Sequence, residues 1–249
     1  MRTLLAIFTC HRYEYTIADY KDWFTRPVVD RVQGIRDSWL KDITIDYKLF
    51  YGQGASRQPL PDEVFLPVID DYHHSDDKIR ALIKYTLDHG YEQLVKIDDD
   101  CYVYWDRLAG NLPTGDYVGS GRGFAVKENF STFRADFAPG FTYSLSRKAM
   151  EILLASPAGP AWAEDRWVGE TLRKRGIPLT IEERFHLVKP TRTNQYINDD
   201  DLLTPNDWLT FHSASPSQMI RLYNHTHGIA DYQRGGKYDS RPKRRAYLF

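Results

Sequence analysis

The order of elements between residues 63 and 97 constrains the fold more than any other feature of this 249-residue sequence. Glu63–Val68 has the apolar character of a short strand, and Ser75 begins an amphipathic segment that ends near Gly90. Serine is a preferred first residue of a helix and glycine is the usual last one. Gln93–Ile97 is again an apolar strand. Strand, helix and strand in this order predict a parallel sheet.

The same patterns extend over most of the chain. Further strands are expected at Leu4–Thr9, Ile45–Tyr51, Asp116–Gly119 and Phe141–Ser146, and further helices at Pro27–Leu40, Arg147–Ala155 and Glu164–Arg175. From about Glu183 onward the sequence is richer in turns and polar residues. We find no linker or repeat, so the prediction is one α/β domain, residues 1–249, with a mostly parallel central sheet flanked by helices.

Composition excludes several classes of protein. A net charge of −1 offers no general attraction for nucleic acid or anionic membranes, although Arg241–Arg245 is locally basic. Two cysteines, Cys10 and Cys101, are too few for a disulfide framework, and we interpret them as buried small residues. No apolar run reaches the ~18 to 20 residues of a membrane span. The apolar stretch at the amino terminus is shorter than the apolar region of a signal peptide. We therefore expect a cytoplasmic protein without a membrane span.

Three aspartates, Asp98 to Asp100, follow the strand Gln93–Ile97 directly. Ligands of open α/β sheets bind beyond the carboxyl ends of the strands. Adjacent carboxylates repel one another, so a cation or hydrogen-bond donors must compensate them, and oxygen ligands suit Mg²⁺ or Mn²⁺. The alternative is a solvated acidic turn. We assign that alternative to a second triplet, Asp199–Asp201, which follows no apolar strand.

Two further acids, Glu164 and Asp165, begin an expected helix. Acids at this position commonly complement the helix dipole. Beside a metal-diphosphate site, either one is a candidate general base, because an acceptor hydroxyl must lose a proton as it attacks. His73, His74 and His89 are explained by the start and end of a helix.

Six ordered motifs resemble the β-1,3-galactosyltransferase, N-acetylglucosaminyltransferase and Fringe superfamily, glycosyltransferase family 31. They are Arg31–Trp39 ("RxxIRxTW"), Asp70–Lys78 ("DxYxNLTxK", with a different centre), Lys96–Val103 ("KxDDDxfV"), Gly140–Ser146 ("GxGYxLS", with Thr142 for the second glycine), Glu164–Gly169 ("EDVxxG") and Phe211–Met219 (around "HSxxPxxM"). The motifs span roughly residues 30 to 220.

This resemblance implies a Rossmann-like GT-A fold, an inverting mechanism, a UDP-sugar donor, a glycan or other hydroxyl acceptor, and Mn²⁺ or Mg²⁺ as cofactor. It implies a nucleotide-sugar-binding half at about residues 1–100, an acceptor and catalytic half at about 101–230, and a basic tail at 231–249. The implied metal ligands are Asp100, His212 and Asp98, the implied base is Asp165 with Glu164 as runner-up, and the implied donor contacts are Arg36, Lys78, Lys96, Asp98 and Asp99.

The assignment of His212 has support from the residues themselves. It directly follows the apolar run Trp208–Phe211, as a ligand delivered by a strand would. His225 and His227 follow no such run. His186 follows one aromatic residue and is the second choice. Three other functions stay open. One is transfer of the sugar to a modified base of viral DNA, which the basic tail alone supports. The others are a catalytically silent nucleotide-sugar-binding protein and a metal-dependent nucleotide hydrolase.

Overall fold

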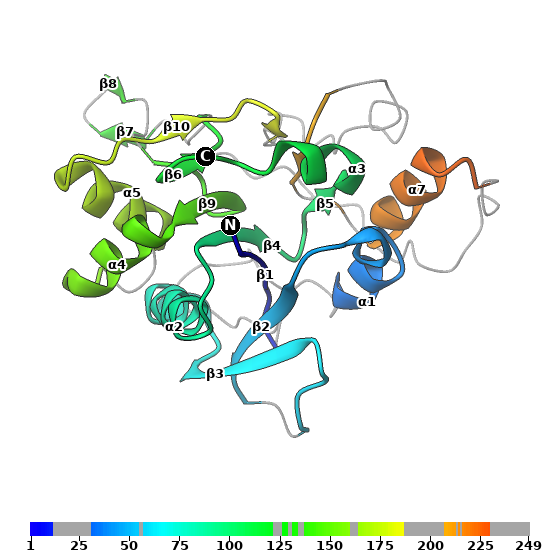
Figure 1. Ribbon diagram of the computed structural model, residues 1–249, viewed down its shortest axis with the longest axis horizontal. Helices are drawn as coiled ribbons and strands as arrows, with labels where there is room; N and C mark the ends of the chain where they lie inside the picture. The colour runs from blue at the N-terminus through cyan, green and yellow to red at the C-terminus, as the bar shows by residue number, and fades with distance from the viewer. Residues whose placement is uncertain are drawn as a thin grey trace.

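The computed structural model describes residues 1–11, 31–54, 57–121, 126–128, 131–133, 137–159, 164–186, 207–212, 214 and 216–229. Figure 1 shows a central sheet with helices packed on both of its faces. The expected α/β class with a mostly parallel sheet is therefore confirmed. The first part of the helix expected from Pro27, the second aspartate triplet and the basic tail lie outside the described residues.

Seven strands form the sheet in the order β10-β6-β9-β4-β1-β2-β3. Their bounds are β1 Thr3–Phe8, β2 Tyr47–Gln53, β3 Glu63–Ile69, β4 Gln93–Asp98, β6 Tyr117–Gly119, β9 Thr142–Ser146 and β10 Thr180–Ile181. Within this sheet β9 is antiparallel to β4 and β6, and all the other pairs are parallel. The reversal of β9 was not part of the expectation.

The helices of the described residues are α1 Arg31–Arg36, α2 Ser75–Asp88, α3 Trp105–Leu108, α4 Arg147–Ala155, α5 Glu164–Lys174 and α7 Pro216–Thr226, with 3₁₀ turns η1 Trp39–Asp42, η2 Tyr72–His74 and η3 Ala109–Asn111. Helices α2, α4 and α5 pack together on one face of the sheet, and α1 packs against α7 on the other (Figure 1). The helix expected over Pro27–Leu40 is thus, in its described part, α1 followed by η1.

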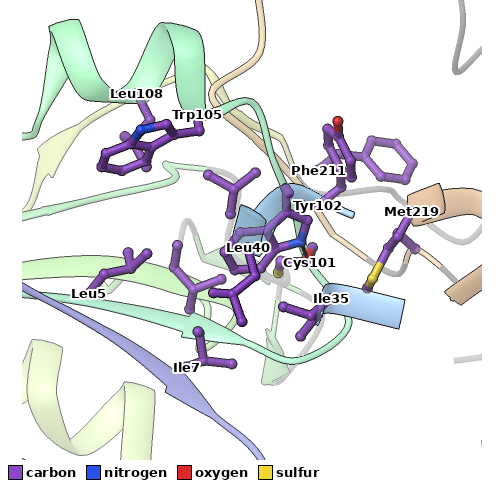
Figure 2. Packing of buried hydrophobic residues seen from close by; sticks show 14 of the residues in the cluster. Leu5, Ile7, Ile35, Leu40, Cys101, Tyr102, Trp105, Leu108, Phe211 and Met219 are labelled. Atoms are coloured by element: carbon purple, nitrogen blue, oxygen red, sulfur yellow. Dashed lines mark hydrogen bonds between the residues drawn. The ribbon is translucent and has the colours of Figure 1, made fainter. Parts of the chain in front are cut away.

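Alternation along the central strands fills a core on each face of the sheet. Leu4 and Ala6 of β1 pack with the α2, α4 and α5 side, whereas Leu5 and Ile7 pack with the α1 and α7 side. Figure 2 shows part of this second cluster, with Ile35 and Met219 among its members. Successive side chains of a strand point to opposite faces of the sheet. Because helices cover both faces, nearly every residue of a central strand is buried, which explains the apolar runs in the sequence.

A small second sheet follows the triplet, in the order β11-β12-β5, from β5 Tyr102–Val103, β11 Phe185–His186 and β12 Thr210–Phe211. Strands β7 Val126–Glu128 and β8 Ser131–Phe133 form a separate antiparallel pair. Cys10 and Cys101 are both free thiols. Among the described helices, none combines the length and the apolar character needed to cross a bilayer.

Candidate functional site

The aspartate triplet lies where the strand order of the sheet reverses. From β1 the chain moves outward through β2 and β3, and then returns through α2 to β4 on the opposite side of β1. Ligands of open α/β sheets bind outside the carboxyl ends of the strands at such a switch point. Phe8 at the end of β1 is paired with Asp98 at the end of β4, so the triplet occupies this position, as expected.

Each carboxylate of the triplet has a basic neighbour, and Arg31 serves two of them. Asp98 Oδ1 lies 2.5 Å from Lys96 Nζ, and Asp99 Oδ1 lies 2.9 Å from Arg31 Nη1. Asp100 lies between two groups, with Arg31 Nη1 3.7 Å from its Oδ2 and His212 Nε2 3.5 Å from its Oδ1. This arrangement explains how three consecutive acids coexist at one strand end.

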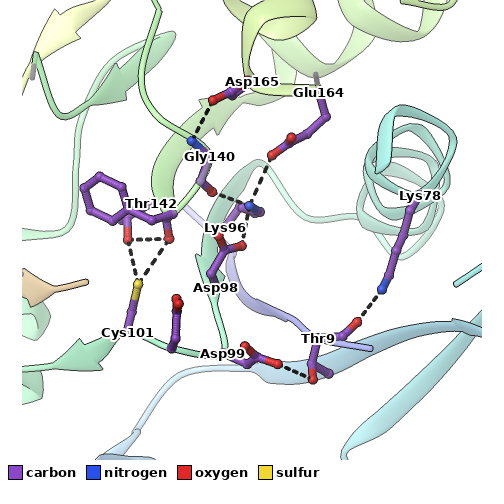
Figure 3. Close-up of polar contacts among 12 residues, drawn as sticks. Thr9, Lys78, Lys96, Asp98, Asp99, Cys101, Gly140, Thr142, Glu164 and Asp165 are labelled. Carbon is purple, nitrogen blue, oxygen red and sulfur yellow. Dashed lines mark hydrogen bonds and ion pairs between the residues drawn. The ribbon is translucent and has the colours of Figure 1, made fainter. Parts of the chain in front are cut away.

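Asp99 is also shielded from water. It is buried and accepts a hydrogen bond of 2.7 Å from the hydroxyl of Thr9 (Figure 3). Burial raises the pKa of Asp99 well above its ordinary value, and the charge of Asp100 raises it further. Partial burial also raises the pKa of Asp98, with the charges of Asp100 and Glu164 adding to the effect and Lys96 opposing it. The site therefore disfavours the ionised forms of both acids, and the positive charge of Lys96 reduces this effect at Asp98.

Asp100 and His212 are the residues that could hold a divalent cation. His212 follows β12, and the backbone N–H of Ala214 donates to the carbonyl of Asp100 at 2.7 Å, which fixes this segment beside the triplet. The described residues contain no ready-made group of three or more metal-ligating side chains. Two ligands fit a Mg²⁺ or Mn²⁺ site of the nucleotide type, because such ions take their remaining ligands from phosphate oxygens and water.

The second-choice histidine has a different environment. The ring of His186 stacks on Trp208 with the ring centroids 4.0 Å apart, and its carbonyl accepts a hydrogen bond from the N–H of His212. His186 therefore supports the strand that carries His212. The structure brings His212, and not His186, into contact with Asp100 among the ion pairs of the described residues.

The start of α5 is joined to the triplet through Gly140 and Lys96 (Figure 3). The N–H of Gly140 donates to Asp165 Oδ2 at 3.1 Å, and its carbonyl accepts from the ammonium of Lys96. Lys96 Nζ also lies 3.3 Å from Glu164 Oε1. A Cβ atom at position 140 would be 2.7 Å from that same oxygen, so a larger residue there would displace the end of the Glu164 side chain.

Asp165 has the pKa of a general base that works near neutral pH. Burial raises the pKa of Asp165 from 3.8 to about 7, and the charge of neighbouring Glu164 contributes to the rise. Glu164 instead faces the Lys96 ammonium. The two adjacent acids thus have different partners, and pairs of acids with separated environments are typical of sites that transfer protons.

Lys96 has a supporting role in the structure, and its expected donor contact stays a prediction. Its side chain is 1% exposed, and an ammonium has three N–H donors, which here meet Asp98, Gly140 and Glu164. Lys96 thus lies beneath the site and joins the triplet to α5. The contact between Lys96 and Asp98 could have been predicted from the sequence, because residues 96 and 98 of a strand point to the same face.

Lys78 is also a supporting residue in this structure. Its buried ammonium donates to the carbonyl of Thr9 and lies 2.6 Å from Asp70 Oδ1, below the carboxyl end of β1. Asp70 in turn accepts from the N–H of His11 at 2.7 Å. The expected donor contact of Lys78 is untested, but these bonds hold the segment that leaves β1.

Arg36 points away from the triplet, and Arg31 of the same helix reaches it. The Arg36 guanidinium binds Asp62 at 2.6 Å and Glu63 at 3.2 Å, at the start of β3. The structure therefore pairs Arg36 with acids at the start of β3, and its expected donor contact stays a prediction. Five residues of α-helix rotate a side chain by about 140°, so the two arginines cannot serve one site. Sequence reasoning placed Arg31 in a motif without giving it a role.

Comparison with known proteins shows likeness in backbone arrangement. The sequence matches no family model, and no curated protein is significantly similar to it. An inositol-1-phosphate CTP transferase structure from T. maritima is 11% identical, with 92% of this chain and 96% of that one covered and a TM-score of 0.46. A glycosyltransferase involved in glycosylation of the major capsid of PBCV-1 is 10% identical, with coverages of 75% and 84% and a TM-score of 0.43. A CMP:2-keto-3-deoxy-manno-octonic acid synthetase is 9% identical, with coverages of 73% and 89% and a TM-score of 0.43.

Proposed function

We propose that the protein is an inverting, metal-dependent glycosyltransferase that moves a sugar from a UDP-sugar to an acceptor hydroxyl, as in glycosyltransferase family 31. The observation that carries this proposal is the joining of two functions at one sheet edge. Asp100 with His212 offers a cation site, and Asp165, with a pKa of about 7, offers a base. Lys96 and Gly140 connect them.

The donor belongs on the triplet side of this edge. Asp100 and His212 would hold Mn²⁺ or Mg²⁺, which neutralises the charge of the departing diphosphate when it is bound. A nitrogen ligand favours Mn²⁺ over Mg²⁺, because Mg²⁺ prefers oxygen. Asp98 is the further donor or metal-water contact, since its side chain is 31% exposed despite the ion pair with Lys96.

The acceptor belongs on the α5 side. Asp165 takes the proton of the acceptor hydroxyl while the hydroxyl oxygen attacks the anomeric carbon. The bond from that carbon to the diphosphate oxygen breaks on the opposite face, so the anomeric configuration inverts. The Gly140 N–H fixes one Asp165 oxygen at 3.1 Å and orients the carboxylate for this transfer.

The six ordered sequence motifs support the same proposal. Their most polar residues, Asp98–Asp100, Glu164, Asp165 and His212, come from distant parts of the sequence and gather at one edge of the sheet. The nucleotide-sugar donor suggested by these motifs also suits a switch-point site.

Turnover with a panel of UDP-sugars, Mn²⁺ and candidate glycan acceptors tests the proposal, with release of UDP and formation of glycoside measured together. We expect acceptor-dependent UDP release that Asp165→Asn abolishes, and unchanged turnover in the control Asp88→Asn, whose exposed carboxylate pairs with Lys84 on α2. Sugar release to water without any glycoside would instead identify a hydrolase. Inversion is checked by the anomeric configuration of the product.

A further inference from the structure

Arg31 contacts the proposed metal ligand Asp100 and its neighbour Asp99. It lies on α1, its side chain is 21% exposed, and its Nη1 faces both carboxylates. That nitrogen lies 2.9 Å from Asp99 Oδ1 and 3.7 Å from Asp100 Oδ2. The other oxygen of Asp100 faces His212 at 3.5 Å. Asp100 therefore lies between an arginine and the second proposed metal ligand.

A divalent cation and this guanidinium compete for the same carboxylate. Small divalent ions bind carboxylate oxygens at about 2.1 Å. An ion held between His212 and Asp100 Oδ1 would therefore bind the carboxylate whose other oxygen is 3.7 Å from Arg31 Nη1, which places the two cations within about 8 Å of each other. Like charges at this distance repel. Arg31 consequently opposes the binding of the ion alone.

A diphosphate changes the sign of this effect. It brings negative charge beside the ion, and a planar guanidinium fork matches phosphate oxygens in geometry. The contact of Arg31 with Asp99 at 2.9 Å is shorter than its contact with Asp100, so the side chain can leave Asp100 while Asp99 still holds it at the site.

We propose that Arg31 is an exchangeable counter-ion, which neutralises Asp100 until the metal and nucleotide arrive and then binds the diphosphate. This inference rests on the proposed function. It gives Arg31 opposite effects on two ligands: it weakens the affinity for Mn²⁺ alone and strengthens the affinity for UDP in the presence of Mn²⁺. A purely structural arginine has no such pair of effects.

The test measures Mn²⁺ affinity by titration calorimetry, first without and then with UDP, on the full chain. In Arg31→Gln we expect the affinity for Mn²⁺ alone to rise about tenfold and the affinity for UDP at saturating Mn²⁺ to fall about tenfold. Arg147→Gln is the matched control, because Arg147 binds the backbone of Tyr91 and Glu92 at the opposite edge of the sheet, and both affinities should equal the wild-type values.

Arg31→Lys is a second variant that keeps the charge beside Asp99. We expect its affinity for Mn²⁺ alone to stay within about threefold of wild type, with weaker UDP binding because the planar fork is lost. If thermal unfolding shows that Arg31→Gln does not fold, the lysine variant tests the proposal in its place. Wild-type UDP affinity in Arg31→Lys would then reject the proposal.

Unchanged or weaker Mn²⁺ binding in a folded Arg31→Gln protein overturns the competition between Arg31 and the ion. Unchanged UDP affinity overturns the diphosphate contact. If the wild type binds no Mn²⁺ even with UDP, or if Asp100→Asn binds it normally, the proposed metal site itself fails, which separates that failure from a failure of the inference about Arg31.

Discussion

Replacement of Asp165 by asparagine should stabilise the protein while it removes activity. Burial and the neighbouring charge of Glu164 raise the pKa of Asp165 to about 7, so the fold disfavours its ionised form. Asparagine stays neutral at every pH, and its carbonyl oxygen can still accept the hydrogen bond from Gly140. The base of the reaction is lost, and we expect kcat to fall by about 10²-fold or more.

The size of the stability change follows from the pKa. Each tenfold difference in proton affinity corresponds to about 1.4 kcal/mol, so an interval from 3.8 to about 7 sets an upper limit of ~4 kcal/mol. Part of the side chain is exposed and water screens its charge, so we expect ~2 to 4 kcal/mol. Because the pKa of Asp165 is raised in the folded state, its carboxyl group in the wild type contributes this stability below pH 3.8, and the contribution is lost as the pH rises through 7. The advantage of the asparagine variant therefore grows over the same interval.

Urea denaturation of wild type and Asp165→Asn at about pH 4 and pH 8.5 measures this effect. The free energies of unfolding should be similar at the lower pH, and the variant should be the more stable protein at the higher pH by the amount given above. Comparison of the two proteins cancels the titration of all other groups. A variant that is less stable at pH 8.5, or a difference that does not grow with pH, would refute the reasoning.

Four further substitutions test the rest of the site. Asp100→Asn should abolish turnover and Mn²⁺ binding while circular dichroism stays unchanged, because the substitution removes a charge from a repelling group. His212→Ala should weaken Mn²⁺ affinity in the presence of UDP, whereas His186→Ala should not; equal effects in both would reject the assignment of His212. Lys96→Met should lower the free energy of unfolding by about 3 to 5 kcal/mol in urea titrations, because Glu164 loses a buried cationic partner; a well-folded, fully stable variant would contradict this.

The central strands and helices could be predicted from the sequence because each has a strong local pattern. Leu4–Phe8 is apolar throughout and Gln93–Ile97 is mostly apolar, since both faces of these strands are buried. The strands expected at Leu4–Thr9 and Gln93–Ile97 correspond to β1 and β4 with end differences of one residue. Ser75 and Gly176 mark the start of α2 and the end of α5, and Gly176 has the positive φ of 80° that such an end requires.

The parts that escaped prediction depend on contacts between distant residues. Two-residue strands such as β5 and β11 are too short to show a period, so their pairing with the strand expected before His212 could not be predicted from the sequence. The direction of β9 is set by pairing with β4, and alternation is the same in either direction. Residue types alone also could not decide that Arg31, rather than Arg36, reaches Asp99.

The reversed direction of β9 determines where the protein can acquire new specificity. Because β9 is antiparallel to its neighbours, its first residue lies at the same edge as the last residue of β6, so the connection between Gly119 and Thr142 leaves and re-enters the sheet beside Gly140 and the triplet. In a fully parallel sheet that connection would have to cross to the opposite edge. Insertions and exchanges within this one stretch of chain can therefore alter the surroundings of the triplet while the strands of the seven-stranded sheet keep their register, which makes it the natural place for loop grafting.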